Sequence, residues 1–183
     1  MNHDSNKSWY EASLLELLDC IEQSHQTVLD NLIPVIRRNI EKALTVDKQY
    51  RQMLTSLNDV FSLFADEIES HFAREEELLV PYIRQIDWYD KNNGDKPQIP
   101  LNSLTNPISQ IEYEHDITEN TLLKTMRIIA SDFKAPPDAS SWLKSLYKGL
   151  EKLEQTIHEH IHIENDILFP KAIQTEMTVL HGK

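Results

Sequence analysis

The sequence is poor in cysteine and contains no long apolar run. Its single cysteine, Cys20, cannot form a disulfide within the chain, which favours a reducing compartment and excludes a zinc site built mainly from thiolates. No stretch approaches the roughly 18 to 20 apolar residues of a membrane-spanning helix. The first residues, MNHDSNKSWYEA, lack the apolar core of a signal peptide. We therefore expect a soluble, cytoplasmic protein without a membrane partner.

Basic residues are also scarce. Lys and Arg number 18 against 30 Asp and Glu, which gives a formal net charge of −12. Such a chain repels phosphate groups, so a nucleic acid or an anionic membrane is not expected as a partner. Glycine occurs only 3 times and 40% of the residues are hydrophobic. The 183 residues therefore suit one globular domain with a core of ordinary size.

Almost the whole chain shows the apolar periodicity of helices, and no segment of strand length alternates with a period of two. Ser13 and Glu16 form a capping-box pattern at the first helix start, and Pro34 predicts a kink. Asn106 and Pro107 predict an N-cap and a first helical position. The predicted helices cover about residues 13–44, 47–86, 107–133 and 141–175, with a loop at 87–106 and a break at KAPPDASS.

Two of the three connections are short, which predicts an all-α fold, an antiparallel up-down four-helix bundle. We expect the bundle to span residues 13–176, between tails at 1–12 and 177–183. The expected inward stripes are Leu14, Leu18, Ile21, His25, Leu29, Leu32 and Ile36; Leu57, Phe61, Phe64, Ile68, His71, Glu75, Leu78 and Tyr82; Ile108, Ile111, His115, Thr118, Leu122 and Ile129; and Leu143, Leu146, Leu150, Leu153, Ile157, His160, Glu164 and Ile167.

The stretch HEHIHIENDILFP contains three histidines, and helical geometry separates them. At about 100° per residue, Glu164 lies about 40° from His160 on the apolar face, whereas His158 and His162 fall roughly 160° away. We expect His160 and Glu164 to face the core and the other two histidines to face solvent. His3 and His181, near the termini, are expected to be solvated as well.

Four buried histidines and two buried glutamates need a common explanation, because an unpaired buried carboxylate is costly. In an antiparallel bundle, all four histidine-containing stripes can place their polar residues at one level. Mixed imidazole and carboxylate ligands suit iron, manganese or zinc. Six ligands exceed one tetrahedral zinc site but fit two ions, with Glu75 and Glu164 bridging them and the histidines terminal. A position left open could then bind a small diatomic molecule.

Ferritin-like carboxylate proteins use a different motif, Glu-x-x-His. That spacing occurs here at Glu22–His25, Glu112–His115 and Glu159–His162. The third pair fails because His162 faces away from the apolar stripe, and the motif would leave His71 and His160 buried without a role. A ferritin-like site is therefore the less favoured interpretation.

Three motifs resemble the hemerythrin-like di-iron domain: HFAREEELLVP at 71–81, EYEHD at 112–116 and HIHIENDILFPKA at 160–172. The resemblance covers roughly residues 13–173 and is strongest to the repair-of-iron-centres proteins, which protect or restore iron–sulfur clusters damaged by nitric oxide or peroxide. It implies iron as the metal, in a non-haem, oxo- or hydroxo-bridged centre of two Fe ions. The ligands that it implies are His25, His71, Glu75, His115, His160 and Glu164.

The sequence departs from this family's pattern in two places. Family members often carry a small N-terminal domain with a Cys-Cys pair, whereas this sequence begins a dozen residues before the expected bundle. Oxygen-carrying hemerythrins have a fifth histidine where this chain has Glu119. Glu119 is then an extra ligand, an acceptor behind a ligand, or a solvated residue at the end of the stripe. Glu67 is a further candidate to lie behind a ligand.

The function that we expect is that of a non-haem di-iron protein in iron–sulfur cluster repair and the nitrosative and oxidative stress response. One alternative is a binding protein, a carrier or sensor of oxygen or nitric oxide. Another is a redox enzyme that reduces nitric oxide or peroxide, so the sequence leaves open whether the protein is an enzyme. The expected partners are O2, NO or peroxide, and damaged iron–sulfur proteins.

Overall fold

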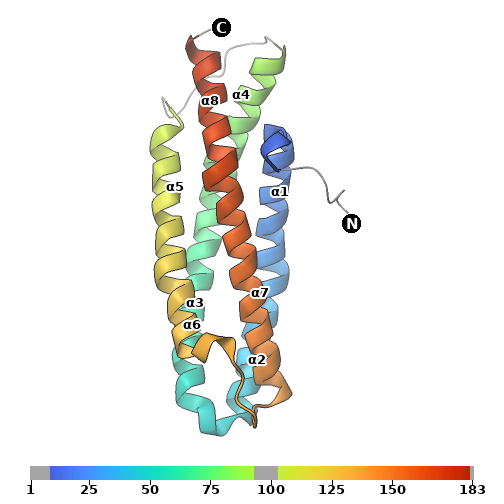
Figure 1. The fold of residues 1–183 in the computed structure, drawn as a ribbon, viewed down its shortest axis with the longest axis vertical. Helices are drawn as coiled ribbons and strands as arrows, with labels where there is room; N and C mark the ends of the chain where they lie inside the picture. Colours follow the sequence, from blue (N-terminus) through green and yellow to red (C-terminus); the bar gives the residue numbers. More distant parts are fainter. Residues whose placement is uncertain (1–8, 93–102, 182–183) are drawn as a thin grey trace.

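The structure is a computed structural model that describes residues 9–92 and 103–181, and within these ranges every long element is a helix. The helices join into four long segments, which Figure 1 shows side by side. The chain descends through α1 and α2, returns through α3 and α4, descends through α5 and α6, and ascends through α7 and α8. The prediction of an all-α, antiparallel up-down four-helix bundle is confirmed.

The α-helices are α1 Leu14–Gln26, α2 Ile33–Val46, α3 Arg51–Arg74, α4 Val80–Asn92, α5 Thr105–Ile117, α6 Lys124–Ile129, α7 Ser141–Ile163 and α8 Phe169–His181. Short 3-10 turns lie at Trp9–Glu11, Lys48–Tyr50 and Ser131–Phe133. Wider π-helical stretches lie between the paired α-helices, at Thr27–Leu32, Glu75–Leu79, Thr118–Leu123 and Glu164–Leu168.

The two predicted helix starts have different outcomes. Ser13 forms the capping box: its hydroxyl accepts from the Glu16 backbone N–H at 3.3 Å, and its own N–H donates to the Glu16 carboxylate at 2.8 Å. Asn106 is not an N-cap, because α5 begins at Thr105, two residues before the predicted Pro107, with Leu104 at the N-cap position. The Leu104 backbone N–H donates to the Glu176 carboxylate at 3.0 Å. A side chain from α8 therefore satisfies this helix start, which local sequence could not reveal.

Two predicted helix ends are too early. The second segment was expected to end near Ile86, but α4 continues to Asn92, and α8 continues past Thr175 to His181. The third segment instead leaves α-helical geometry at Ile129, before a 3-10 turn. Residues 93–102 of the predicted loop, His3 and the His181 side chain lie outside what the structure describes.

Each of the four long segments contains one π-helical stretch, and the sequence analysis predicted none of them. A π turn takes in extra residues, so the residues after it present a shifted face to the core. Leu29 and Leu32 of the predicted first stripe are only half-buried, while Ile33 is buried. In the second segment Leu78 is 49% exposed and Leu79 only 2%. The predicted stripes are therefore wrong by one position within these two π turns, whereas Ile36 and Tyr82 beyond them are buried as predicted.

The apolar core consists of two clusters, one at each end of the bundle. In the first segment, Ile21 belongs to one cluster and Val28 to the other, and His25 lies between them. In each of the other three segments, the buried residues also pass from one cluster to the other close to the predicted histidine ligand of that segment. The polar site thus separates two apolar regions that keep bulk water away from it.

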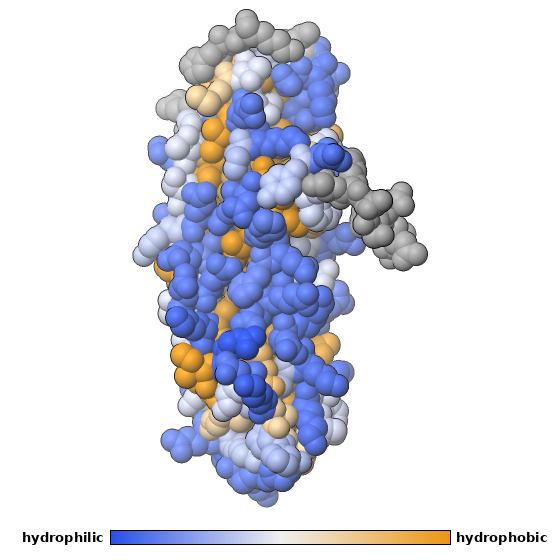
Figure 2. All heavy atoms as spheres, in the orientation of Figure 1, coloured by the Kyte–Doolittle hydropathy of each residue, from blue (hydrophilic) through white to orange (hydrophobic). Residues whose placement is uncertain are grey.

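The outer surface is mainly polar. Figure 2 shows hydrophilic residues over most of the visible face, with narrow strips of hydrophobic residues between them. Among the described residues, no helix has the length and apolar character needed to cross a membrane.

Candidate metal centre

The six predicted ligands meet between the two apolar clusters, and none is more than 4% exposed. Five of them, His71, Glu75, His115, His160 and Glu164, offer ligand atoms that all lie within 4.8 Å of one another. His25 adjoins this group, with its Nε2 at 3.1 Å from Glu75 Oε2. Each of the four long segments contributes at least one of these side chains.

His71 and Glu75, and likewise His160 and Glu164, lie one turn apart on one helix face where a π turn begins. His71 Nε2 lies 3.1 Å from Glu75 Oε1, and His160 Nε2 lies 3.0 Å from Glu164 Oε2. Glu75 and Glu164 are themselves the first residues of their π-helical stretches. π turns inside α-helices occur frequently at functional sites, and here the four of them surround the candidate site.

Three of the four histidines have an outer hydrogen-bond partner on another segment. His25 Nδ1 pairs with Glu76 Oε1 at 2.8 Å, His71 Nδ1 with Glu114 Oε2 at 2.8 Å, and His115 Nδ1 with Asn165 Oδ1 at 2.9 Å. A carboxylate or amide oxygen only accepts, so these Nδ1 atoms donate. Glu76, Glu114 and Asn165 are not predicted from the sequence, where their only signal is that each adjoins a predicted ligand in the chain.

In neutral histidines, as a metal ion binds them, this pairing leaves the inner nitrogens without protons. With Nδ1 protonated, His71 and His115 direct Nε2 lone pairs at each other across 3.1 Å. The His25 Nε2 lone pair likewise faces the Glu75 carboxylate at 3.1 Å. Such contacts repel unless a cation lies among them, and a metal ion that accepts several lone pairs meets that need.

Unsatisfied polar atoms are concentrated at the same place. With these histidines neutral, seven buried side-chain atoms of the described residues lack a hydrogen-bond partner, and six of them belong to His25, Glu75, His160 and Glu164. The seventh is Arg74 Nε, outside the ligand group. Buried groups without partners are costly, and coordination to metal is one of the few ways to satisfy them.

A comparison with known protein families also points to a cation-binding domain. The model of the Hemerythrin HHE cation binding domain matches residues 17–172. The chain belongs to the hemerythrin family. Relatives include the "Iron-sulfur cluster repair protein YtfE" of Escherichia coli O81 (strain ED1a), of Escherichia coli O1:K1 / APEC and of Escherichia fergusonii. Each is 28% identical over 170 residues, which cover 93% of this chain and 71% of the relative.

Hemerythrin-family chains hold a non-haem di-iron centre, and this member has the residues for one. The buried cluster supplies imidazole nitrogens and carboxylate oxygens, the ligand types that iron accepts. Its facing lone pairs and unsatisfied oxygens are features that bound cations would resolve.

In the metal-free hemerythrin site, protons take the place of cations. Burial lowers the pKa of His71, but hydrogen bonds with Glu75 and Glu114 outweigh it and raise the pKa to about 9. Burial also lowers the pKa of His25, and its bonds with Glu75 and Glu76 again outweigh it and raise the pKa. Burial and the Glu164 charge act to raise the pKa of Glu75, but its hydrogen bonds with His25 and His71 lower it overall.

Metal uptake at pH 7 should therefore release protons. His71, with a pKa of about 9, is protonated at pH 7 in the metal-free protein, whereas a metal ion binds the unprotonated Nε2. The release should decline as the pH rises through about 9, where His71 has already lost its proton. Titration calorimetry in buffers of different ionisation heat measures the proton count. Identical heats in all buffers at pH 7 would contradict the prediction.

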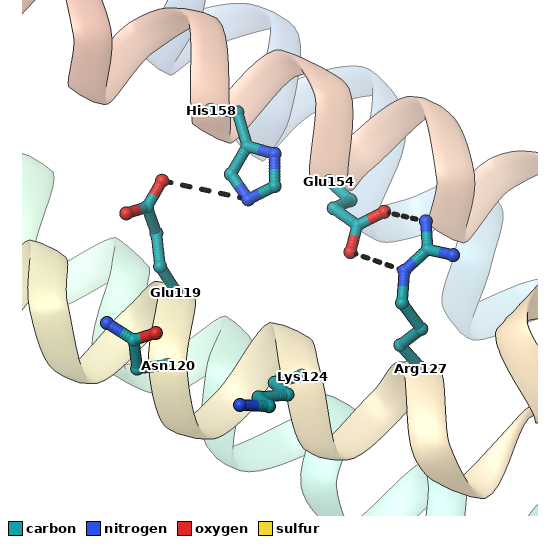
Figure 3. A pocket seen from close by; sticks show the side chains of 6 residues that line it. All are labelled: Glu119, Asn120, Lys124, Arg127, Glu154 and His158. Carbon is teal, nitrogen blue, oxygen red and sulfur yellow. Dashed lines mark hydrogen bonds and ion pairs between the residues drawn. The ribbon is translucent and has the colours of Figure 1, made fainter.

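Glu119 does not join the ligand group of this hemerythrin-family chain. Its carboxylate points to His158 across a surface pocket, with Oε1 at 3.6 Å from Nε2 (Figure 3). The pocket has a volume of about 330 Å³, and the Arg127–Glu154 ion pair lines its other end. Of the three roles considered for Glu119, that of a surface residue beyond the end of the stripe fits this structure. Glu67 is likewise exposed.

His158 and His162 lie on the outer face of their helix, as helical geometry predicted. The side chains of His158 and His162 are 50% and 53% exposed, and His162 pairs with Asp166 at 2.6 Å. The carboxylates of the ferritin-type motif also point outward: Glu112 and Glu159 are exposed, and Glu22 lies on the surface with its carboxylate on Arg84. The structure therefore does not support a ferritin-type ligand set.

Proposed function

We propose that the six buried side chains hold the two iron ions of the centre. Each glutamate has two of the histidines beside it. Glu75 lies 3.1 Å from His71 and from His25, and Glu164 lies 3.2 Å from His115 and 3.0 Å from His160. Each ion would take two of the four histidines, and both carboxylates would be placed to bridge the ions.

We propose that this centre serves the repair of damaged iron–sulfur clusters, including damage by nitric oxide or peroxide. The observation that carries the proposal is the buried site of four histidines and two glutamates in a chain whose relatives are named iron–sulfur cluster repair proteins. The bound ions would supply iron and one-electron redox chemistry. The side chains would hold them through only two charged ligands, and two histidines for each ion would leave coordination positions free. Its partners would be damaged iron–sulfur proteins, in the cytoplasm.

Reactivation of a damaged enzyme tests the proposal. A [4Fe–4S] dehydratase is inactivated with nitric oxide or peroxide, freed of small molecules, and incubated anaerobically with the iron-loaded protein, a thiol reductant and a chelator that removes free iron. We expect dehydratase activity to return with the wild type and with His162→Ala, and not with His71→Ala. No recovery with the fully loaded wild type would overturn the repair function.

A second candidate is a reversible carrier of oxygen, because the two flanking apolar clusters shield the site as a carrier requires. The division of histidines favours repair instead. A carrier must bind oxygen without losing electrons to it, and two histidines per ion give neither position a saturated ligand set. The outward position of Glu119 does not alter that division.

Oxygen cycling should therefore be irreversible. When the protein is reduced anaerobically, exposed to oxygen and then evacuated, we expect its absorption spectrum to remain that of the oxidised form. The reduced protein should also react readily with nitric oxide. A spectrum that returns to the reduced form under vacuum over repeated cycles would instead establish the carrier.

A further inference from the structure

The buried centre does not use two histidines of the HEHIHIENDILFP stretch. The side chains of His158 and His162 are 50% and 53% exposed, on the outer face of α7. Residues 158–162 read His-Glu-His-Ile-His, which is also the H-E-x-x-H spacing. On a helix, side chains four residues apart have Cβ atoms about 5–6 Å apart, and two histidines at this spacing can bind one zinc ion. The outer face of α7 therefore presents a second pair of candidate metal ligands.

Each of these two histidines already faces a carboxylate. Glu119, in the π-helical stretch Thr118–Leu123, points to His158 across the surface pocket, with Oε1 at 3.6 Å from Nε2 (Figure 3). An ion held about 2.1 Å from each atom fits this separation. His162 Nδ1 donates to Asp166 Oδ2 at 2.6 Å, which leaves the Nε2 lone pair for a metal. A carboxylate behind the ring N–H is the usual outer partner of a metal-binding histidine.

The charges around the pocket favour a cation. The pocket has a volume of about 330 Å³, which leaves room for an ion and its water ligands. Arg127, at the other end, is neutralised by Glu154, whose carboxylate accepts from its Nε at 2.9 Å. Lys124 also lines the pocket, but the carboxylates of Glu119 and Asp166 together outweigh its charge. The net charge of −12 on the chain adds to the attraction.

The outward ligands are less closely assembled than the buried ones. Among the described residues, the buried group is the one in which three or more ligand atoms are already gathered. The outward side chains must close around an ion by rotation, which their exposure allows. Ordering exposed side chains costs conformational entropy, so the outer ion should be held more weakly than those of the centre. Desalting should therefore remove the outer ion and leave the irons in place.

We propose that His158, His162 and Glu119 form a second metal site, which binds a zinc ion on the outer surface. Asp166 is a positioning residue that holds the His162 ring. Two imidazoles and one carboxylate are a ligand set that zinc accepts, with water in the fourth tetrahedral position. Zinc also binds such a set more tightly than Fe²⁺ does. The ion would link the third segment to the fourth, immediately outside the buried centre.

Zinc titration of the iron-loaded protein tests the site. The protein is freed of excess metal and titrated with Zn²⁺ by calorimetry at pH 7, and its iron content is measured afterwards. We expect the wild type to bind one zinc ion per chain and to keep its iron. The double variant His158→Ala, His162→Ala should lose this binding and also keep its iron, because neither side chain faces the centre. No zinc binding by the wild type, equal binding by the double variant, or zinc uptake only as iron leaves would each overturn the proposal.

A matched pair of variants separates a ligand from a general charge effect. Glu119→Gln and Glu159→Gln remove the same charge from the same surface, and Glu159 is exposed and accepts from Gln155 at 3.2 Å. We expect Glu119→Gln to weaken zinc binding and Glu159→Gln to leave it unchanged. Equal weakening in both would mean that the negative surface attracts the ion and that Glu119 is not its ligand.

The role of Asp166 is tested by two substitutions. Asp166→Ala should weaken zinc binding about 10- to 100-fold, whereas Asp166→Asn keeps an acceptor oxygen for the His162 ring and should restore most of the affinity. An unchanged affinity in Asp166→Ala would remove Asp166 from the site.

A crystal of the zinc-loaded protein locates the ion directly. Measured at the zinc absorption edge, it should show anomalous signal between His158, His162 and Glu119, and a signal elsewhere would overturn the proposal. None of these measurements involves an iron–sulfur protein. Failure of the repair assay would therefore leave the zinc site standing, and failure of the zinc site would leave the repair function standing.

Discussion

Glu75→Gln should remove both irons, reducing the content from about two per chain to nearly none. Its two carboxylate oxygens lie at 3.1 Å from His71 and from His25, and in the proposed centre Glu75 would bridge both ions, so one substitution would affect both. Glutamine keeps the shape of the side chain but replaces one oxygen with an amide nitrogen that cannot bind metal. Elemental analysis of the anaerobically loaded and desalted protein gives the result.

Glu77→Gln provides the matched control for this substitution. It makes the same chemical change two residues further along the same π turn, at a position that is exposed to solvent. We expect it to bind iron like the wild type. If Glu75→Gln kept two irons, or if both variants lost them equally, Glu75 would not be the bridging ligand.

Helical geometry was sufficient to place the inward residues from sequence. His160 and Glu164 lie one turn apart on α7, and the 100° rotation per residue holds up to the π turn that begins at Glu164. The same rule placed His158 and His162 on the outer face, where the structure has them. That these six inward side chains bind metal stays a proposal, but their convergence at one level is a property of the fold.

The residues behind the ligands could not be predicted in this way. Glu76 reaches His25 across a separation of 51 residues, and Asn165 reaches His115 across 50. Both positions lie next to an inward ligand, and a sequence reading assigns such neighbours to solvent. Which of them turns toward a histidine depends on how two segments pack, and one segment's periodicity does not contain that information.

The π turns escaped prediction for a related reason. No residue type marks them, because their stability comes from tertiary contacts rather than from local propensity. The π turns are evident only where a residue of a predicted inward stripe is exposed and its neighbour is buried instead, as with Leu78 and Leu79. Strict three- and four-residue spacing therefore described the segments up to the site and failed just beyond it.

Removal of the iron should lower the melting temperature by about 10 °C. A ligand held at about 1,000 times its Kd adds about 4 kcal/mol to the stability of the folded state, and in a domain of this size each kcal/mol shifts Tm by about 2–4 °C. In the metal-free protein Glu75 and Glu164 remain buried, with unsatisfied oxygens that protonated histidines offset only in part. Differential scanning calorimetry of the iron-loaded and chelator-stripped protein measures the difference.

Glu75→Gln separates the effect of iron from that of the side chains. The substitution removes one partner of the buried ion pair between Glu75 and protonated His71, so the metal-free variant should melt lower than the metal-free wild type. Added iron should raise Tm in the wild type and leave it unchanged in the variant. An equal rise in both would mean that the stabilising ion binds elsewhere. No rise in the wild type would mean that metal binding and the folding of these four segments are not coupled, contrary to what a ligand set drawn from all four requires.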